Sequence, residues 1–76
     1  MQFNYIQSNP AILNGKPCIK NTRISVDIII EWLANGATVN DVLLQYPQLN
    51  QNAVNEALLY AANYLKNDAY FEVKVA

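Results

Sequence analysis

Histidine is absent from this sequence, and cysteine occurs only once, as Cys18. A tetrahedral zinc site, a Cys–His nucleophile pair and a disulfide each need more of these side chains, so all three are excluded within one chain. Glycine occurs only twice, at Gly15 and Gly36, and the two lie too far apart to form a phosphate-cradling loop. We therefore expect no metal, no cofactor and no catalytic residue.

Long apolar runs are also missing. The longest unbroken run, 57–62, falls far short of the ~20 residues that cross a bilayer. Residues 1–8 have neither the basic nor the apolar region that is typical of a signal peptide. Together with a lone thiol that is expected to stay reduced, these features predict a cytoplasmic protein without a membrane partner.

Charge is scarce, at 14% of residues, whereas 53% of residues are hydrophobic, and this balance is typical of a folded chain. A length of 76 residues leaves room for one core. We expect a single domain over 1–76, with an arm of strand, turns and basic segment at 1–24. A trihelical core is expected at 25–67, followed by a C-terminal strand or tail at 68–76.

Capping residues mark the first two helices. Ser25 can cap a helix that ends at Asn35-Gly36, where glycine adopts the left-handed conformation that closes many helices. Thr38, with Asp41 three residues later, forms a variant of the capping box. This second helix is expected to stop before Pro47, because the residue preceding a proline disfavours helical geometry.

The remaining elements complete the predicted fold. A third helix is expected from Asn50 to about Asn67, and alternating patterns predict strands over 3–7 and 70–75. Residues 18–24 follow a tight turn at Asn14-Gly15 and are extended in character, interrupted by Asn21, which can occupy a left-handed position. The predicted fold class is mainly α: a three-helix, helix-turn-helix-like (homeodomain-like) bundle with short N-terminal and C-terminal β-strands.

The first helix is apolar around most of its circumference. Its core stripe is predicted to contain Val26, Ile29, Ile30 and Leu33. Ile28 and Trp32 widen this stripe beyond what one neighbouring layer covers. The helix is either central and buried by its own domain, or Ile28 and Trp32 lie at a homodimer interface; in so short a chain we favour the interface.

The third helix has two distinct sides. Its core stripe is predicted to contain Ala53, Val54, Ala57, Leu58, Ala61 and Leu65, with Tyr60 and Tyr64 on one shoulder. Its opposite side carries the candidate DNA-reading residues Asn52, Asn55, Leu59, Asn63 and Lys66. Asparagine can pair with adenine in the major groove, and an apolar group can touch a thymine methyl. The alternative is that these residues are only solvated.

Positive charge is concentrated in one segment. Lys16, Lys20 and Arg23 lie close together without an intervening acid, while the rest of the chain has two basic and six acidic residues. Three phosphate contacts predict a salt slope of about −2.7, or roughly −5 for a dimer. The alternative is a solvated loop with no ligand.

The C-terminal pattern places Phe71, Val73 and Val75 on one side of a strand, and makes them candidate partner-binding residues. An isolated strand leaves its backbone groups unpaired. It can pair with residues 3–7, exchange with a dimer mate, or add to the sheet of a partner protein. Pairing within the domain is the default expectation.

The stretch Gly15-Lys16-Pro17-Cys18-Ile19-Lys20-Asn21-Thr22-Arg23-Ile24-Ser25-Val26 resembles the signature of the domain-of-unknown-function 433 (DUF433) family. The similarity continues through 33–38, 41–43, 46–49 and 54–61. Asn21 replaces a usual glycine and Ser25 a common proline, and both exchanges are physically mild. The resemblance implies a homeodomain-like, commonly dimeric fold and an antitoxin encoded beside a nuclease-like toxin.

Three function classes remain to be weighed. The leading hypothesis is a DNA-binding antitoxin that binds operator DNA, represses its own promoter and neutralises a cognate toxin protein. The alternative is a dimeric protein–protein interaction module without DNA binding, which the overall acidity favours. An enzyme is the weakest class, because Asp27 and Glu31 point outward on one helix with no histidine to act as a base.

Overall fold

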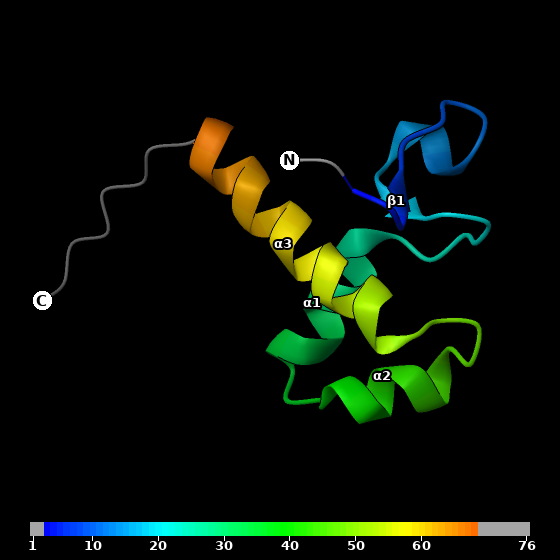
Figure 1. Ribbon diagram of the computed structural model, residues 1–76, viewed down its shortest axis with the longest axis vertical. Helices are drawn as coiled ribbons and strands as arrows, with labels where there is room; N and C mark the ends of the chain where they lie inside the picture. Colours follow the sequence, from blue (N-terminus) through cyan, green and yellow to red (C-terminus); the bar gives the residue numbers. More distant parts are fainter. Residues whose placement is uncertain (1–2, 69–76) are drawn as a thin grey trace, which may run out of the picture.

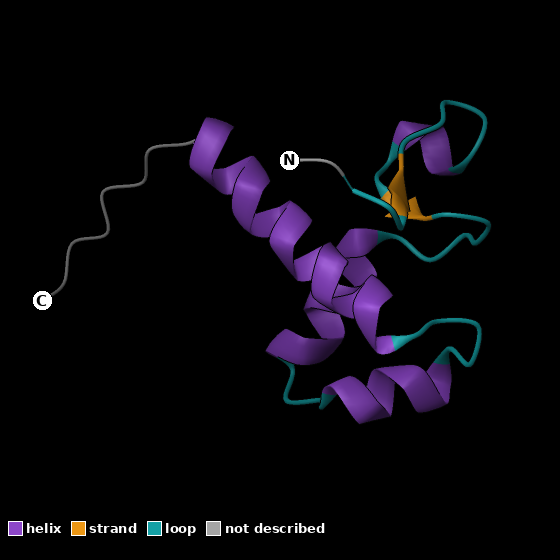
Figure 2. Cartoon of the chain, viewed as in Figure 1, coloured by secondary structure: helices purple, strands orange, loops and turns teal. Residues whose placement is uncertain are grey.

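A computed structural model describes residues 3–68 of the chain. Its elements follow in the order β1 (Ile6–Gln7), the 3-10 turn η1 (Leu13–Gly15), β2 (Cys18–Ile19), α1 (Val26–Ala34), α2 (Val39–Gln45) and α3 (Gln51–Asp68). Three helices and a short antiparallel sheet near the N-terminus form a mainly helical small domain, as predicted (Figures 1 and 2). The strand expected over 70–75 lies outside the described residues.

The strands are shorter than the predicted extended segments, and they pair with each other, which the sequence analysis did not foresee. Ile6 pairs with Ile19 and Gln7 with Cys18, so that each strand contributes two residues. The interruption predicted at Asn21 is confirmed: Asn21 adopts a φ of 63°, and the amide of Thr22 donates a 3.1 Å hydrogen bond to the carbonyl of Ile19. This reversal ends β2 and forms an exposed turn before α1.

The helices begin where their capping residues predicted. The Ser25 hydroxyl accepts a hydrogen bond from the amide of Ile28. Thr38 and Asp41 form a reciprocal capping box with hydrogen bonds of 2.9 and 3.1 Å. The Asn50 side chain accepts a 2.8 Å hydrogen bond from the amide of Ala53. Each cap satisfies an amide that the helix itself leaves unpaired.

The core joins the N-terminal segment to all three helices. Its buried members are Ile6, Ile19, Ile24, Val26, Ile29, Val42, Leu49, Ala53, Val54 and Ala57. Phe3 packs edge-on against Tyr60, with ring centroids 5.2 Å apart. Phe3, Ile6, Ile19 and Ile24 therefore anchor the N-terminal segment to the body of the domain, with β1 against α3.

Two residues predicted to lie in the core are exposed instead. Leu58 is 39% and Leu65 is 51% accessible to solvent, which corrects the predicted core stripe of α3. For Leu65 the physical reason is length, since α1 has 9 residues and α3 has 18, so α1 cannot cover the second half of α3. Leu58 is exposed because it lies about 100° around the helix from the fully buried Ala57, at the edge of the core-facing side. No helix among residues 3–68 is long and apolar enough to span a membrane.

Candidate nucleic-acid interface

The first half of α3 turns a polar surface to solvent. Asn52, Asn55 and Leu59 are all exposed, and Leu59 retains 52% of its accessibility. Ala53 and Val54 are buried on the opposite side and fix the rotation of the helix about its axis. The three exposed side chains recur every three or four residues, so they form one continuous stripe. We name Asn52, Asn55 and Leu59 the reading stripe.

Two further residues predicted for this surface lie at the other end of the helix. At a rise of 1.5 Å per residue, Lys66 is about 21 Å along the axis from Asn52. Asn63 is half-buried, whereas Lys66 is exposed. The structure therefore separates Asn63 and Lys66 from the beginning of α3, the part of a recognition helix that contacts base edges.

The basic turn is connected to α3 through Tyr5. Lys20 and Arg23 are exposed, and the amide of Lys20 donates a 2.8 Å hydrogen bond to the carbonyl of Tyr5. The amide of Tyr5 in turn donates a 2.7 Å hydrogen bond to Oε1 of Glu56 on α3. In Figure 1 this turn and the loop between α2 and α3 project on the same side of the molecule. Two hydrogen bonds thus link the basic turn to the helix that carries the reading stripe.

Lys16 is separate from the other two basic residues. Its ammonium forms an ion pair with Oδ2 of Asp27 at 3.2 Å, and both side chains are largely exposed. The hydroxyl of Ser25 also donates a hydrogen bond to Asp27. Ser25 first, and Lys16 second, lower the pKa of the Asp27 carboxyl below its ordinary value. The predicted basic cluster is therefore divided, because the Lys16 charge already has a partner.

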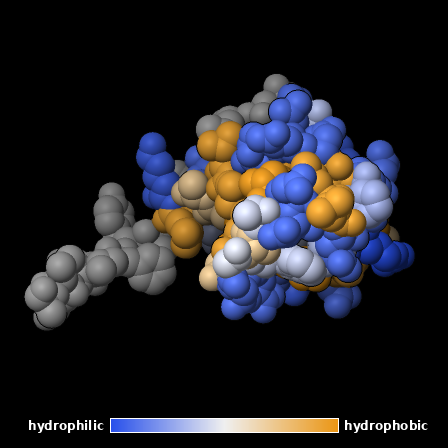
Figure 3. Space-filling view, turned by 90° about the horizontal axis from the view of Figure 1, so that it is seen from below, coloured by the Kyte–Doolittle hydropathy of each residue, from blue (hydrophilic) through white to orange (hydrophobic). Residues whose placement is uncertain are grey.

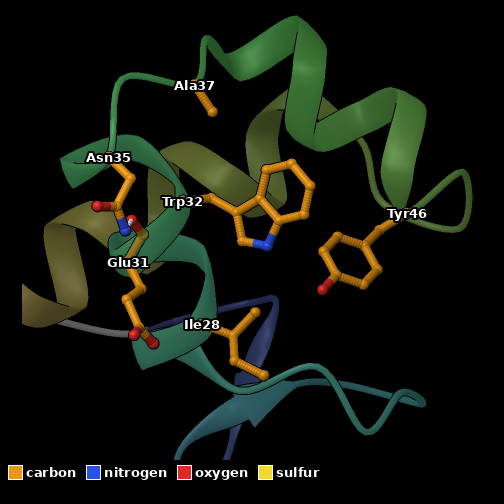
Figure 4. A pocket seen from close by; sticks show the side chains of 6 residues that line it. All are labelled: Ile28, Glu31, Trp32, Asn35, Ala37 and Tyr46. Carbon is orange, nitrogen blue, oxygen red and sulfur yellow. Dashed lines mark hydrogen bonds between the residues drawn. The ribbon is translucent and has the colours of Figure 1, made fainter.

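Ile28 and Trp32 border a shallow pocket between α1 and α2 with a volume of about 560 Å³ (Figure 4). The ring of Trp32 meets that of Tyr46 edge-on, with centroids 6.1 Å apart. Ile28 remains 37% exposed. Trp32 thus has an aromatic partner within its own chain, which the sequence analysis did not foresee. We name this hollow the α1–α2 pocket.

A second hollow is larger and more apolar, with a volume of about 720 Å³. It lies between α1 and the second half of α3, and its apolar lining includes Ile30, Ala34, Tyr60, Ala61, Tyr64 and Leu65. Lys16, Asp27 and Glu31 also line it. Sequence reasoning missed this α1–α3 groove, because it assigned Ile30 and Leu65 to the core. The available signal was the difference in length between the two predicted helices.

Titratable side chains do not gather into a metal site in this part of the chain. Within residues 3–68, no group of three or more Cys, Asp or Glu side chains is placed to hold an ion. Cys18 is a free, fully buried thiol in β2 of the sheet. The described surface carries amide groups, the exposed cations Lys20, Arg23 and Lys66, and apolar hollows.

Comparison with known proteins agrees with this architecture. The family model described as "Protein of unknown function (DUF433)" matches residues 6–61. The crystal structure of a DUF433 member protein from Anabaena variabilis superposes with a TM-score of 0.74 at 33% sequence identity. That match covers 84% of the present chain but only 60% of the Anabaena chain. No curated protein matches the sequence.

Proposed function

The chain belongs to the DUF433 family, and we propose that it is a cytoplasmic DNA-binding regulator that represses its own promoter and acts as an antitoxin. The observation that carries the DNA-binding part is the reading stripe at the beginning of α3, fixed in space by the core and linked through Tyr5 to the basic turn. This arrangement supplies both kinds of contact that operator binding needs: groups for base edges and cations for phosphates.

Base reading is assigned to the reading stripe. The amides of Asn52 and Asn55 can each donate to and accept from the edge of adenine in the major groove. Leu59 offers an apolar surface to a thymine methyl on the same side of the helix. Leu59 is 52% exposed and so contributes little to the core, whereas contact with DNA would give this exposed apolar side chain a role.

Phosphate binding is assigned to Lys20 and Arg23. Both lie in the exposed turn before α1, whereas the Lys16 ammonium forms an exposed ion pair with Asp27. Two contacts per chain give four in a dimer, and four contacts predict a slope of log K against log salt of about −3.6. So shallow a slope describes a modest binder whose affinity depends on two chains acting together.

The test is fluorescence anisotropy with a duplex from the chain's own upstream region and with a scrambled duplex, over a salt series. We expect preference for the upstream duplex and a slope near −3.6. Charge reversal at Lys20 and Arg23 should abolish binding, while the matched variant Lys16→Glu should change it little. Equal, weak binding to both duplexes would reject the operator-binding role.

The base-reading step has its own variants. Asn52→Ala or Asn55→Ala should lower affinity for the upstream duplex by about 1–3 kcal/mol and leave scrambled binding unchanged. Asn63→Ala serves as the control, since Asn63 lies beyond the start of the helix and is half-buried. Equal loss from all three variants would argue against base reading at the reading stripe.

The antitoxin part of the proposal comes from the family resemblance and requires a surface for a protein partner. Phe71, Val73 and Val75 are the candidates for that contact, through strand addition to the partner's sheet. A second candidate function, a protein-interaction module without DNA binding, is favoured by the apolar α1–α3 groove. Charge reversal at Lys20 and Arg23 distinguishes the two, because it would spare co-purification with the neighbouring gene product.

A further inference from the structure

The second half of α3 carries apolar side chains beyond the end of the core. Within 51–66, Ala57 is the last buried residue of the helix, whereas Tyr64 and Leu65 are 57% and 51% exposed. These two side chains, together with Tyr60 and Ala61, form the α3 wall of the α1–α3 groove. Figure 1 shows this half of the helix extending past α1, and Figure 3 shows apolar colour reaching the edge where α3 ends.

The opposite wall of the groove is one stripe of α1. Val26, Ile30 and Ala34 recur at four-residue intervals, so they lie on one side of the helix and extend over about 12 Å along its axis. The charged residues of the lining are all exposed: Lys16, Asp27 and Glu31. These charged groups can therefore stay in water while an apolar segment occupies the space between the two helices.

The residues that follow α3 in the sequence have the pattern and the length that this groove requires. Residues 69–76 lie outside the described residues, and their sequence alternates apolar Phe71, Val73 and Val75 with charged Glu72 and Lys74. A period of two places the three apolar side chains of an extended segment on one side and both charges on the other. Five extended residues, 71–75, span about 13 Å, which matches the length of the α1 wall.

This segment is attached beside the groove. Leu65 lines the groove and precedes the end of α3 at Asp68 by about 4.5 Å along the axis. Three residues of extended chain span about 10 Å, so a chain that reverses direction after Asp68 can return to Leu65 by residue 71. A segment on so short a tether meets its groove at an effective concentration in the millimolar range, far above that of a second copy in a micromolar solution. The attached segment is therefore favoured over other apolar occupants.

We propose that the chain covers the α1–α3 groove with its own residues 71–75. Phe71, Val73 and Val75 enter the groove, and Glu72 and Lys74 face water. The docking itself does not depend on the proposed function, but its consequence rests on it. The same three apolar side chains are the candidates for strand addition to a partner protein, so binding of that partner must first release them from the groove. The groove then competes with the partner for one segment.

Nuclear Overhauser spectra of the full chain test this docking directly. We expect contacts between the ring protons of Phe71 and the methyl groups of Ile30 and Ala34, unchanged on dilution. In a mixture of isotope-labelled and unlabelled chains, an isotope filter separates contacts within one chain from contacts between two. Absence of these contacts would overturn the proposal. Contacts found only between chains would overturn it as well, because they would assign the groove to another copy.

A matched pair of variants tests the segment. Val73→Ser should shift the methyl signals of Ile30 and Leu65, because it replaces an apolar side chain that enters the groove. Glu72→Ser lies on the other side of the segment's pattern and should leave both signals in place. Equal shifts in the two variants would contradict the proposed side of contact.

A second pair tests the groove. Ala34→Glu should remove the contacts between Phe71 and Ile30, because it places a charge in the apolar wall. Ala62→Glu is the control, since Ala62 is also exposed but lies on α3 outside the groove lining, and it should preserve them. Circular dichroism should show that both variants retain their helices. Contacts that survive Ala34→Glu would refute the docking.

The docking and the proposed function fail separately. Contacts of Phe71 in the groove, without binding of the neighbouring gene product, would refute the antitoxin role alone. Binding of that protein by a chain that lacks these contacts would refute the docking alone.

Discussion

The backbone amide of Tyr5 donates a 2.7 Å hydrogen bond to the carboxylate of Glu56, a residue 51 positions later in the chain. Glu56 lies in the first half of α3, and Tyr5 directly precedes β1. This contact joins the N-terminal segment to the helix that carries the reading stripe. It also gives a structural role to an acidic side chain whose charge would otherwise only disfavour DNA.

Removing the Glu56 carboxylate should destabilise the domain. Glu56→Ala leaves the partly buried Tyr5 amide without its acceptor, and hydrogen bonds to charged groups contribute about 1.5–3 kcal/mol. Urea unfolding should therefore show a loss of roughly that size. Glu56→Gln keeps an oxygen acceptor and should lose less. Equal losses for the two variants would mean that the side chain contributes through its charge and not through this hydrogen bond.

Core packing against α1 should depend strongly on the position of the residue on the helix. Ile29 is fully buried, whereas its neighbour Ile28 is 37% exposed. Ile29→Val should therefore lower the free energy of unfolding by about 0.5–1.5 kcal/mol. The same substitution at Ile28 should stay within about 0.5 kcal/mol. Thermal denaturation of the two single variants at one protein concentration provides the comparison, and a reversed order would contradict the described orientation of α1.

The beginning of α3 should be sensitive to its cap. Asn50→Ala removes the acceptor for the amide of Ala53 and should cost about 1 kcal/mol of stability. Asn40→Ala, an identical exchange at an exposed position of α2, is the control and should be close to neutral. Denaturant unfolding measures both. If the two variants lost the same amount, the Asn50 cap would not stabilise the domain.

The pKa of Asp27 should be below its ordinary value, and the effect should come mainly from Ser25. ¹³C NMR titration of the carboxyl should show a larger rise of the pKa in Ser25→Ala than in Lys16→Ala. Because the pKa is lowered in the folded state, the associated stability is present above the unfolded-state pKa and is lost as the pH falls through the folded value. Asp27→Asn should remove this part of the acid sensitivity, and an unchanged acid transition would contradict the assignment.

Much of the fold was predictable from the sequence because its determinants are local. Ser25, Thr38 and Asn50 each cap an amide three residues later, so a short window of sequence defines where each helix begins. The strands were predicted too long because a run of extended residues does not show which of them will find a backbone partner. The interruption at Asn21 was itself predictable, since asparagine tolerates the left-handed φ of 63° that it adopts after β2.

The candidate site was only partly predictable. The reading stripe follows from helical periodicity once α3 is recognised, and its residues lie together as expected. Helical periodicity does not predict that, within residues 3–68, Lys16 is paired while Lys20 and Arg23 are not. Lys16 forms its ion pair with Asp27, from which a strand and a turn separate it in the sequence. Similarly, nothing in the spacing placed the ring of Tyr46 against that of Trp32.

The sequence by itself determined the three helices, their caps and the side of α3 that faces the core, because these depend on contacts between residues three or four positions apart. Only the tertiary structure decided how far the core reaches along α3. The α1–α3 groove exists because a helix of 9 residues packs against one of 18, which leaves Tyr64 and Leu65 exposed. That outcome depends on where along α3 the shorter helix packs, and the pattern within either helix does not fix that position.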